Sequence, residues 1–354
     1  MAISEREVLE ALKAVEDPDL RRDIVTLGFI KELVLEGDQV AFTIELTTPA
    51  CPARDQIASQ ARQAISALPG IKNVEVRMTA QVTSGAGEKS PLIPKVKNTI
   101  AVASGKGGVG KSTVAANLAV ALARAGAAVG LMDTDVYGPS IPILMGAEQT
   151  PTVSGDRLIP PVQYGVKLIS MAYFLPKDDA VIWRGPMLHK TIQQFLGNVE
   201  WGELDYLVMD LPPGTGDIQL SLCQTIPLTG AVIVSTPQDL AMAVASKAIV
   251  MFRKLKVPIL GIIENMSTYL CPSCGHEEHI FGHGGARAAS EKMEIPFLGD
   301  IPLAPTIRET SDRGHPLALE ENSPYGTAFQ QIAANVAAQV SVVNFKVPNL
   351  VSIQ

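Results

Sequence analysis

The chain has 354 residues, enough for about two domains of ordinary size. Apolar residues make up 47% of it and charged residues 18%, which indicates a folded core and excludes a disordered chain. The net charge of −7 argues against a protein that coats nucleic acid or anionic lipid. The sequence has neither an apolar run of about 18 residues nor an apolar signal-peptide core. We therefore expect a soluble, cytoplasmic protein that binds neither nucleic acid nor membrane.

The first 80 residues have the pattern of a small α+β domain. Ser4 and Glu7 form a capping box ahead of an apolar stripe, which predicts a helix near the start. The elements expected after it are a hairpin at 29–46 around a Gly-Asp turn, a helix that begins at Pro52 and a strand at 71–78. We assign residues 1–80 to this domain.

Residues 81–98 contain Gly, Ser, Pro and Lys without an apolar period, and we interpret them as a linker. From 99 to 345 the pattern changes to short, nearly continuous apolar runs, which are typical of parallel strands covered on both faces. The sequence therefore predicts an α/β fold with a mostly parallel, doubly wound sheet. The expected strands are 99–104, 127–133, 206–212, 230–236 and 258–265, and the expected helices are 112–125, 238–255 and 284–293.

A complete phosphate-binding loop, GKGGVGKS, follows the first apolar run and matches G-x-x-x-x-G-K-[ST]. Its glycines let backbone N–H groups turn toward one anion. Lys111 supplies charge for the β- and γ-phosphates, and Ser112 offers a hydroxyl to Mg²⁺. The sequence thus predicts a P-loop NTPase that binds ATP and Mg²⁺, and the alternative is a Gly-rich turn that matches by chance. The expected nucleotide ligands are Gly105, Lys106, Gly107, Gly108, Val109, Gly110, Lys111, Ser112 and Thr113.

A second lysine, Lys106, stands at the start of this loop. Its side chain cannot easily reach its own γ-phosphate while the loop wraps that phosphate. It can reach the nucleotide of a facing subunit and neutralise charge there, as an arginine finger does. The alternative is a solvated surface lysine. We favour the first interpretation, which makes both Lys106 and Lys111 catalytic and predicts a homodimer.

Carboxylates follow two further apolar runs. Asp133 and Asp135 come after the second run, and Asp210 comes after the third. A carboxylate at the end of a buried strand is costly unless a cation or another partner is near it. We therefore expect Asp210 to hold Mg²⁺, Asp135 to position the attacking water and Asp133 to be a further residue of the ATP and Mg²⁺ site. For any one of the three, a turn or helix-cap role is the alternative.

A pair of cysteines, Cys271 and Cys274, has the CxxC spacing. Two thiolates on one tight turn can face one soft metal centre. Zinc, iron–sulfur and thiol–disulfide chemistry all use this spacing, but the redox alternative needs a thioredoxin-like setting. His276, His279 and His283 could complete a mixed zinc site, although we favour them as polar loop residues. Spacing alone leaves zinc and iron–sulfur both open.

Several longer motifs resemble a known family. KGGVGKS, DTDVYGPS, DLPPGTGD and IIENMS are similar to the deviant-Walker ATPases, which include the septum-positioning, chromosome-partitioning and nitrogenase iron-protein ATPases. Together with WRGPM and CPSCGHEEHIFGHGG, they resemble the Mrp-type iron–sulfur cluster carrier ATPases. The resemblance covers roughly residues 96–340.

This resemblance implies roles for individual residues. Lys106 would act across a dimer, Asp135 and Asp210 would be catalytic residues in the two switch segments, Asp217 would end the second switch, and Asn265 would contact the adenine. The resemblance also favours an iron–sulfur cluster over zinc as the ligand of the cysteine pair. A 4Fe–4S cluster usually takes four thiolates, so a symmetric dimer would supply Cys271 and Cys274 from each subunit across its axis.

A further cysteine, Cys51, stands just before Pro52, where we expect a helix to begin. The helix dipole should then lower the pKa of its thiol, and the alternative is a small buried residue at a tight turn. This segment and EDPDL at 16–20 resemble the small α+β domain of iron–sulfur assembly factors. Cys51 is thus a candidate cluster-transfer residue, whereas Cys223 lies in an apolar stretch and is expected in the core.

The function that the sequence favours is an ATP-hydrolysing carrier that passes an iron–sulfur cluster to apo iron–sulfur proteins and works with cluster scaffold proteins. A positioning ATPase that cycles on membrane or DNA is one alternative, but the C-terminal tail lacks a basic amphipathic helix. An ATPase with a structural zinc at the CxxC pair is another. An ATP-dependent electron donor similar to nitrogenase reductase is the third, and its cysteines should lie farther apart in sequence.

Overall fold

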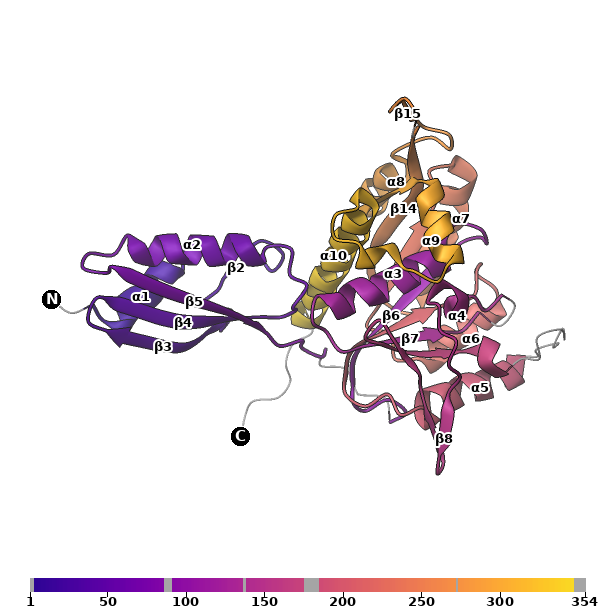
Figure 1. The fold of residues 1–354 in the computed structure, drawn as a ribbon, viewed down its shortest axis with the longest axis horizontal. Coiled ribbons are helices and arrows are strands. Elements are labelled where there is room, and N and C mark those ends of the chain that lie inside the picture. Colours follow the sequence, from indigo (N-terminus) through magenta and orange to yellow (C-terminus); the bar gives the residue numbers. More distant parts are fainter. Residues whose placement is uncertain (1–2, 86–90, 136–137, 175–184, 272, 347–354) are drawn as a thin grey trace.

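The computed structural model describes residues 3–85, 91–135, 138–174, 185–271 and 273–346. Figure 1 shows a small N-terminal unit beside a larger unit built around one sheet. Each unit has its own hydrophobic core, and the larger unit has one core on each face of its sheet. The chain thus has the two-part α+β and α/β arrangement that its patterns predict.

The N-terminal unit consists of a three-stranded sheet with two helices packed against it (Figure 1). Strands β3 and β4 form the expected hairpin, and β5 pairs parallel to β4 after the crossover through α2. The predicted capping box is present, because Ser4 and Glu7 exchange side-chain and backbone hydrogen bonds. The elements are α1 (Glu5–Leu12), β1 (Glu16–Asp17), β2 (Arg22–Asp23), β3 (Ile30–Glu36), β4 (Gln39–Leu46), α2 (Arg54–Ser66) and β5 (Asn73–Ala80).

The larger unit is built on a nine-stranded sheet whose order is β10-β11-β7-β12-β6-β13-β14-β15, with β16 also paired to β14. Within the described residues, every strand of this sheet runs parallel except β10 and β15. The strands are β6 (Val96–Ser104), β7 (Val129–Asp133), β10 (Val162–Gln163), β11 (Val166–Ser170), β12 (Leu204–Asp210), β13 (Gly230–Ser235), β14 (Ile259–Leu270), β15 (Glu277–Glu278) and β16 (Phe297–Leu303). All five expected strands are present.

Helices cover both faces of this sheet, because its strands are apolar on both sides. Helices α3 and α10 contribute to the core on one face, and α5 and α7 contribute to the core on the other. The helices are α3 (Lys111–Arg124), α4 (Ile141–Leu144), α5 (Gly185–Asn198), α6 (Asp217–Thr225), α7 (Asp239–Lys254), α8 (Gly285–Met293), α9 (Pro305–Asp312) and α10 (Pro324–Lys346). Two 3₁₀ turns, η1 (Met171–Phe174) and η2 (Leu317–Leu319), and a hairpin of β8 (Thr152–Ser154) and β9 (Arg157–Ile159) complete the unit.

The segment between the two units packs against the larger one over part of its length. Strand β6 begins at Val96, so the last three residues of the expected linker belong to the sheet. Val82 and Ile93 are buried, and the Thr83 carbonyl accepts hydrogen bonds from the amides of Asn98 and Asn344. These contacts hold part of the connecting segment in place.

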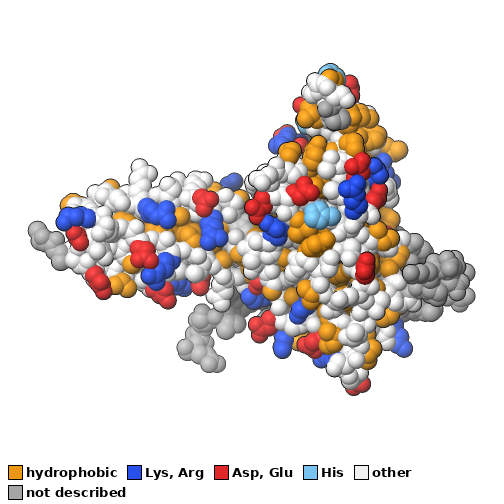
Figure 2. All heavy atoms as spheres, in the orientation of Figure 1, with side chains coloured by type: hydrophobic (Ala, Val, Ile, Leu, Met, Phe, Trp, Pro, Cys, Tyr) orange, Lys and Arg blue, Asp and Glu red, His pale blue; other side chains and the backbone are white. Residues whose placement is uncertain are grey.

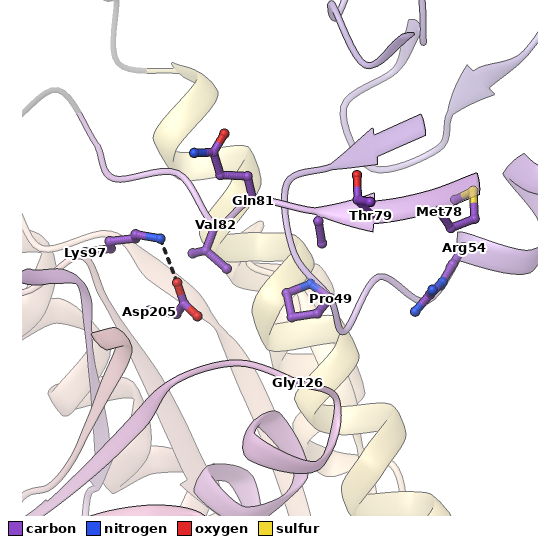
Figure 3. A pocket seen from close by; sticks show the side chains of 10 residues that line it. Pro49, Arg54, Met78, Thr79, Gln81, Val82, Lys97, Gly126 and Asp205 are labelled. Carbon is purple, nitrogen blue, oxygen red and sulfur yellow. Dashed lines mark hydrogen bonds and ion pairs between the residues drawn. The ribbon is translucent and has the colours of Figure 1, made fainter. Parts of the chain in front are cut away.

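A narrow seam joins the two units at the amino-terminal end of the large sheet (Figure 3). The Tyr206 hydroxyl donates to the Thr48 hydroxyl at 3.0 Å, and Pro49 lies beside Gly126. A cavity of about 280 Å³ remains between the units, with the Lys97–Asp205 ion pair at 2.8 Å in its wall. Among the described helices, none has the length and apolar character needed to cross a membrane.

Candidate functional site

The phosphate-binding loop lies between β6 and α3, at the carboxyl edge of the large sheet. Gly108 and Gly110 have φ values of +77° and +81°, a left-handed conformation that glycine adopts without a Cβ clash. Gly110 is the N-cap of α3, so the amide-bearing end of this helix faces the loop. The loop encloses a cavity of about 260 Å³. Asp135, Ser140, Leu144 and Pro213 also line this cavity.

Two of the loop glycines, Gly105 and Gly110, are required by close packing. A Cβ on Gly105 would lie 2.5 Å from the backbone carbon of Val244 in α7. A Cβ on Gly110 would lie 2.2 Å from the Asn265 amide nitrogen. The loop is therefore fitted against α7 on one side and β14 on the other, and a larger residue at either glycine would displace it.

The acidic residues come together because their strands are neighbours. Strand β12 lies between β7 and β6, and Asp210 at the end of β12 is in register with Asp133 at the end of β7. The phosphate-binding loop leaves the neighbouring strand β6. The carboxyl ends of parallel strands meet at one edge of a sheet, which is where such folds bind ligands. The sheet order thus places both carboxylates beside the loop.

Lys111 and Asp210 form a buried ion pair in this structure. The Lys111 ammonium lies 2.5 Å from Asp210 Oδ1 and 3.9 Å from Asp135 Oδ2. Burial raises the pKa of Asp210, and the adjacent Lys111 ammonium opposes that rise. The second carboxylate oxygen, Asp210 Oδ2, is buried and has no hydrogen-bond partner among the described residues. An unpaired buried carboxylate oxygen beside the Ser112 hydroxyl is a donor set that fits a hard cation such as Mg²⁺.

Asp133 holds the loop that follows β7. Its carboxylate, fully buried, accepts hydrogen bonds from the backbone N–H groups of Asp135 and Ile141 and from the Ser170 hydroxyl. Burial, together with the nearby charge of Asp210, raises the pKa of Asp133 to about 7. In this structure Asp133 therefore shapes the segment that carries Asp135. The Asp135 carboxylate itself faces Lys111 and lines the cavity.

Lys106 and Asn265 have partners within the chain. The Lys106 ammonium lies 3.4 Å from the Gln238 side-chain oxygen, just before α7. The Asn265 amide is buried and donates to the Val109 carbonyl of the phosphate-binding loop at 2.8 Å. Asp217 begins α6, but its side chain lies outside the part of the chain that the structure describes.

Some residues at the border of this site were not predicted from the sequence. Gln238 contacts Lys106, and Pro213 and Ser140 line the cavity. Gln238 and Pro213 could have been found from their positions in the sequence, because each follows the carboxyl end of a buried parallel strand. Ser140 also follows a buried parallel strand, β7, at the end of the motif DTDVYGPS.

The cysteine pair lies on a hairpin that extends β14 beyond the sheet (Figure 1). Cys271 is partly exposed, Cys274 is exposed, and both are free thiols. The turn is closed by hydrogen bonds from the Gly275 N–H to the Cys271 carbonyl and from the Cys271 N–H to the His276 carbonyl. Backbone N–H groups of Ser273 and Cys274 point at the Cys271 sulfur and lower the pKa of that thiol. The turn thus favours a thiolate, the form that binds metals.

The histidines near this pair have other partners. His276 lies 3.3 Å from Glu278, His279 and His283 stack with ring centres 4.8 Å apart, and His283 approaches Glu264 at 3.8 Å. Among the described residues, no group of three or more His, Cys, Asp or Glu side chains is placed to hold a metal ion. Among the described residues, the tip of the hairpin therefore carries two thiols from one chain.

The prediction of a lowered pKa for Cys51 is wrong. Helix α2 begins at Arg54 with Ala53 as its N-cap, so Cys51 stands before the first turn. Its side chain is half-buried against the core of the N-terminal unit. Burial raises the pKa of this thiol to about 11 and outweighs the hydrogen bond from the Ala53 N–H. Cys223 is buried in the core, as expected, and burial raises the pKa of its thiol to about 12.

A mostly parallel sheet with a phosphate-binding loop after one strand and acidic residues at the ends of the next two defines a P-loop NTPase. A family model described as NUBPL iron-transfer P-loop NTPase matches residues 95–337, and one described as iron–sulfur cluster assembly protein matches residues 5–78. The chain belongs to the NUBPL iron-transfer P-loop NTPase family.

Similar proteins cover almost the whole chain. It is 49% identical over 338 residues to the iron–sulfur cluster carrier protein of Deinococcus radiodurans, and the match covers 95% of each chain. It is 43% identical to the iron–sulfur cluster carrier protein of Escherichia coli K12, over 94% of this chain and 93% of that one. It is also 43% identical to the chloroplastic Fe–S cluster assembly factor HCF101 of Arabidopsis thaliana, over 99% of this chain and 66% of the relative.

Solved structures match the larger unit. The nucleotide-binding protein from Archaeoglobus fulgidus, solved in complex with ADP, is 45% identical with a TM-score of 0.58, and the match covers 65% of this chain and 90% of that one. The cell division ATPase MinD of Pyrococcus furiosus is 23% identical with a TM-score of 0.50, over 68% of this chain and 98% of that one. At this identity, the similarity to MinD concerns the fold alone.

Proposed function

We propose that this protein binds and hydrolyses ATP and carries a 4Fe–4S cluster, which it passes to apo iron–sulfur proteins. The observation that carries the proposal is the pair Cys271 and Cys274 on the turn that directly follows strand β14, whose Asn265 holds the phosphate-binding loop. Strand β14 thus runs from the phosphate-binding loop to a turn that carries two soft thiol ligands. The names of the similar proteins from Deinococcus radiodurans and Escherichia coli support a carrier role.

For the nucleotide, we assign the loop amides and Lys111 to the β- and γ-phosphates. Ser112 and Asp210 are the residues that would hold Mg²⁺, which would neutralise phosphate charge when bound. The phosphates would compete for the Lys111 ammonium, and Mg²⁺ would compete for the Asp210 carboxylate. Nucleotide binding therefore requires that the Lys111–Asp210 ion pair separates. Asp135, beside Lys111 at the cavity wall, would orient the attacking water.

The cysteine site requires a second subunit in this proposal. Each chain offers two thiols at the hairpin tip, and a 4Fe–4S cluster usually takes four. A symmetric homodimer would place both hairpins on its axis and would bring Lys106 to the nucleotide of the partner subunit. Leu270 and Ile280, each 53% exposed beside the cysteines, supply apolar surface for that contact. Figure 2 shows hydrophobic side chains on the arm below the tip.

The remaining assignments complete the proposal. Asn265 would contact the adenine from its place beside the loop, and Asp217 would end the second switch segment. Cys51 would at most assist transfer, because its thiol is half-buried and has a raised pKa. Scaffold proteins would load the cluster, and free thiols at the hairpin suit a reducing compartment such as the cytoplasm.

The test is iron binding after anaerobic reconstitution with iron and sulfide. We expect one 4Fe–4S cluster per dimer, seen by absorption and by iron per chain on the dimer fraction. Cys271→Ser and Cys274→Ser should each lose the cluster, because a serine hydroxyl is a hard, weakly acidic ligand. Cys223→Ser, a change at a cysteine in the core, is the matched control and should retain it. Zinc in place of iron in anaerobically isolated protein would contradict the proposal.

A further inference from the structure

Strand β14 physically connects the phosphate-binding loop to the cysteine hairpin. Near the middle of the strand, the Glu264 carboxylate accepts hydrogen bonds from the N–H groups of Gly284 and Ala286 at the start of α8. The next residue, Asn265, donates to the Val109 carbonyl of the loop. Both side chains are buried, so this part of the strand is fixed to two neighbours at once.

The strand is interrupted immediately after these anchors. Met266 has φ +59°, a left-handed conformation that is uncommon for a non-glycine residue. The ladder with β16 passes from the Asn265–Ile301 pair directly to the Tyr269–Leu303 pair. Four steps along β14 therefore match two along β16, which makes a bulge between the loop contact and the hairpin.

A second anchor holds the far side of this bulge. Ser267 is fully buried, and its hydroxyl lies 3.3 Å from the Asp300 carboxylate and 3.2 Å from the Ile301 carbonyl of β16. Beyond it, Tyr269 pairs with β15, and the cysteine turn begins two residues later. Cys271 lies six residues after Asn265, so the chain between them can span at most about 20 Å.

We propose that Asn265, Met266 and Ser267 form a positioning relay through which nucleotide in the phosphate-binding loop sets the position of the cysteine pair. Phosphates bound by the loop amides pull on the loop backbone at Val109, and Asn265 follows because its amide is bonded there. The left-handed residue then determines on which side of the strand the following residues emerge. The relay rests on the proposed function only in taking the cysteines as the cluster ligands.

Two substitutions at Met266 distinguish this relay from ordinary packing. Met266→Asn keeps the left-handed conformation accessible, because asparagine tolerates it. Met266→Val is close in apolar character, but a β-branched side chain strongly disfavours that conformation. If the conformation at this position carries the coupling, the asparagine variant should behave like the parent protein and the valine variant should not.

The experiment uses the full chain without cluster and measures the alkylation rate of each cysteine with iodoacetamide by mass spectrometry. We expect a non-hydrolysable MgATP analogue to change the rates at Cys271 and Cys274 by at least about fivefold. Met266→Asn should retain this change, and Met266→Val should lose it while its nucleotide affinity stays the same. Cys51, in the other unit, is the internal control and should react at a constant rate.

Each outcome decides the inference. A valine variant with the parent's response, or a parent protein without any response, would overturn the relay. A response that appears only at a tenfold higher protein concentration would also overturn it, because it would arise from dimer formation. If Met266→Val fails to fold, Ser267→Ala should weaken the response instead. If the parent protein binds no iron after reconstitution but its cysteine alkylation rates still respond to nucleotide, the proposed function is refuted and the relay is not.

Discussion

The nucleotide site and the cysteine hairpin lie on one sheet, but they differ in how much of each site one chain supplies. In the nucleotide site the Lys111 side chain is 6% exposed, and its ammonium already has Asp210 at 2.5 Å and Asp135 at 3.9 Å. At the hairpin, Cys274 is exposed and the neighbouring histidines are engaged elsewhere. Buried charges must be balanced within the fold, whereas exposed thiols need no partner until a ligand arrives.

This contrast has a consequence for stability and for exchange. A site made of buried, paired charges contributes to folding, and its parts cannot be removed without disturbing their neighbours. A site of one partly exposed and one exposed thiol on a short turn can be changed without unfolding the chain, which suits the proposed release of a cluster.

The largest effect is expected for Lys111→Ala. Removal of the ammonium leaves the buried Asp210 carboxylate without its counter-charge, so the free energy of unfolding should fall by about 3–5 kcal/mol. MgATP affinity should fall by roughly 100-fold or more, as for loss of one partner of a buried charge pair. Urea denaturation and calorimetry measure the two quantities. Lys106→Ala, at the partly exposed lysine of the same loop, is the control and should keep both close to the parent.

Asp135→Asn should separate binding from turnover. The amide is nearly isosteric but is a poorer acceptor for the proton of the attacking water, so the ATPase rate should fall by about 100-fold. MgATP affinity should change little, because Lys111 and the loop amides remain. A steady-state assay beside calorimetry measures both. Turnover equal to that of the parent would assign the water to another residue.

A smaller effect is expected from pH. Burial raises the pKa of Asp133 to about 7, so between the ordinary carboxyl pKa and 7 the folded chain binds more protons at this group than the unfolded chain does. Its contribution to stability is therefore complete at low pH and is lost as pH rises through 7. Asp133→Asn should remove this loss, so the variant should gain stability relative to the parent from pH 5 to pH 8. A constant difference across that range would contradict the raised pKa.

Sequence patterns predicted the strands that are apolar along their whole length, because burial on both faces leaves a clear mark. Strands β11 and β16 were not expected, since VKLIS is short and is interrupted by Lys167, and FLGDIPL contains both glycine and proline. Helix α10 has alanine and valine around most of its circumference, so it lacks the amphipathic stripe that marks a surface helix.

The chemistry of the sites was predictable where a motif fixes the backbone, as it does for Lys111 and Ser112. The pKa of a side chain was not predictable where burial opposes a local effect such as a helix dipole. For Cys51 the helix-dipole argument failed, because α2 begins at Arg54 and because the core of the small unit covers the thiol. The bulge at Met266 has no sequence mark, since a left-handed methionine is held there by its surroundings.

In the proposed function, one chain supplies half of the cluster site. Mixed dimers of parent chains and chains with both Cys271→Ser and Cys274→Ser test it most directly, when they are separated by affinity tags and reconstituted anaerobically. The account predicts one 4Fe–4S cluster on the parent dimer and loss of the full cluster on the mixed dimer, with nucleotide binding unchanged in both. A mixed dimer that holds a complete cluster, or a parent protein with one cluster on each chain, would contradict it.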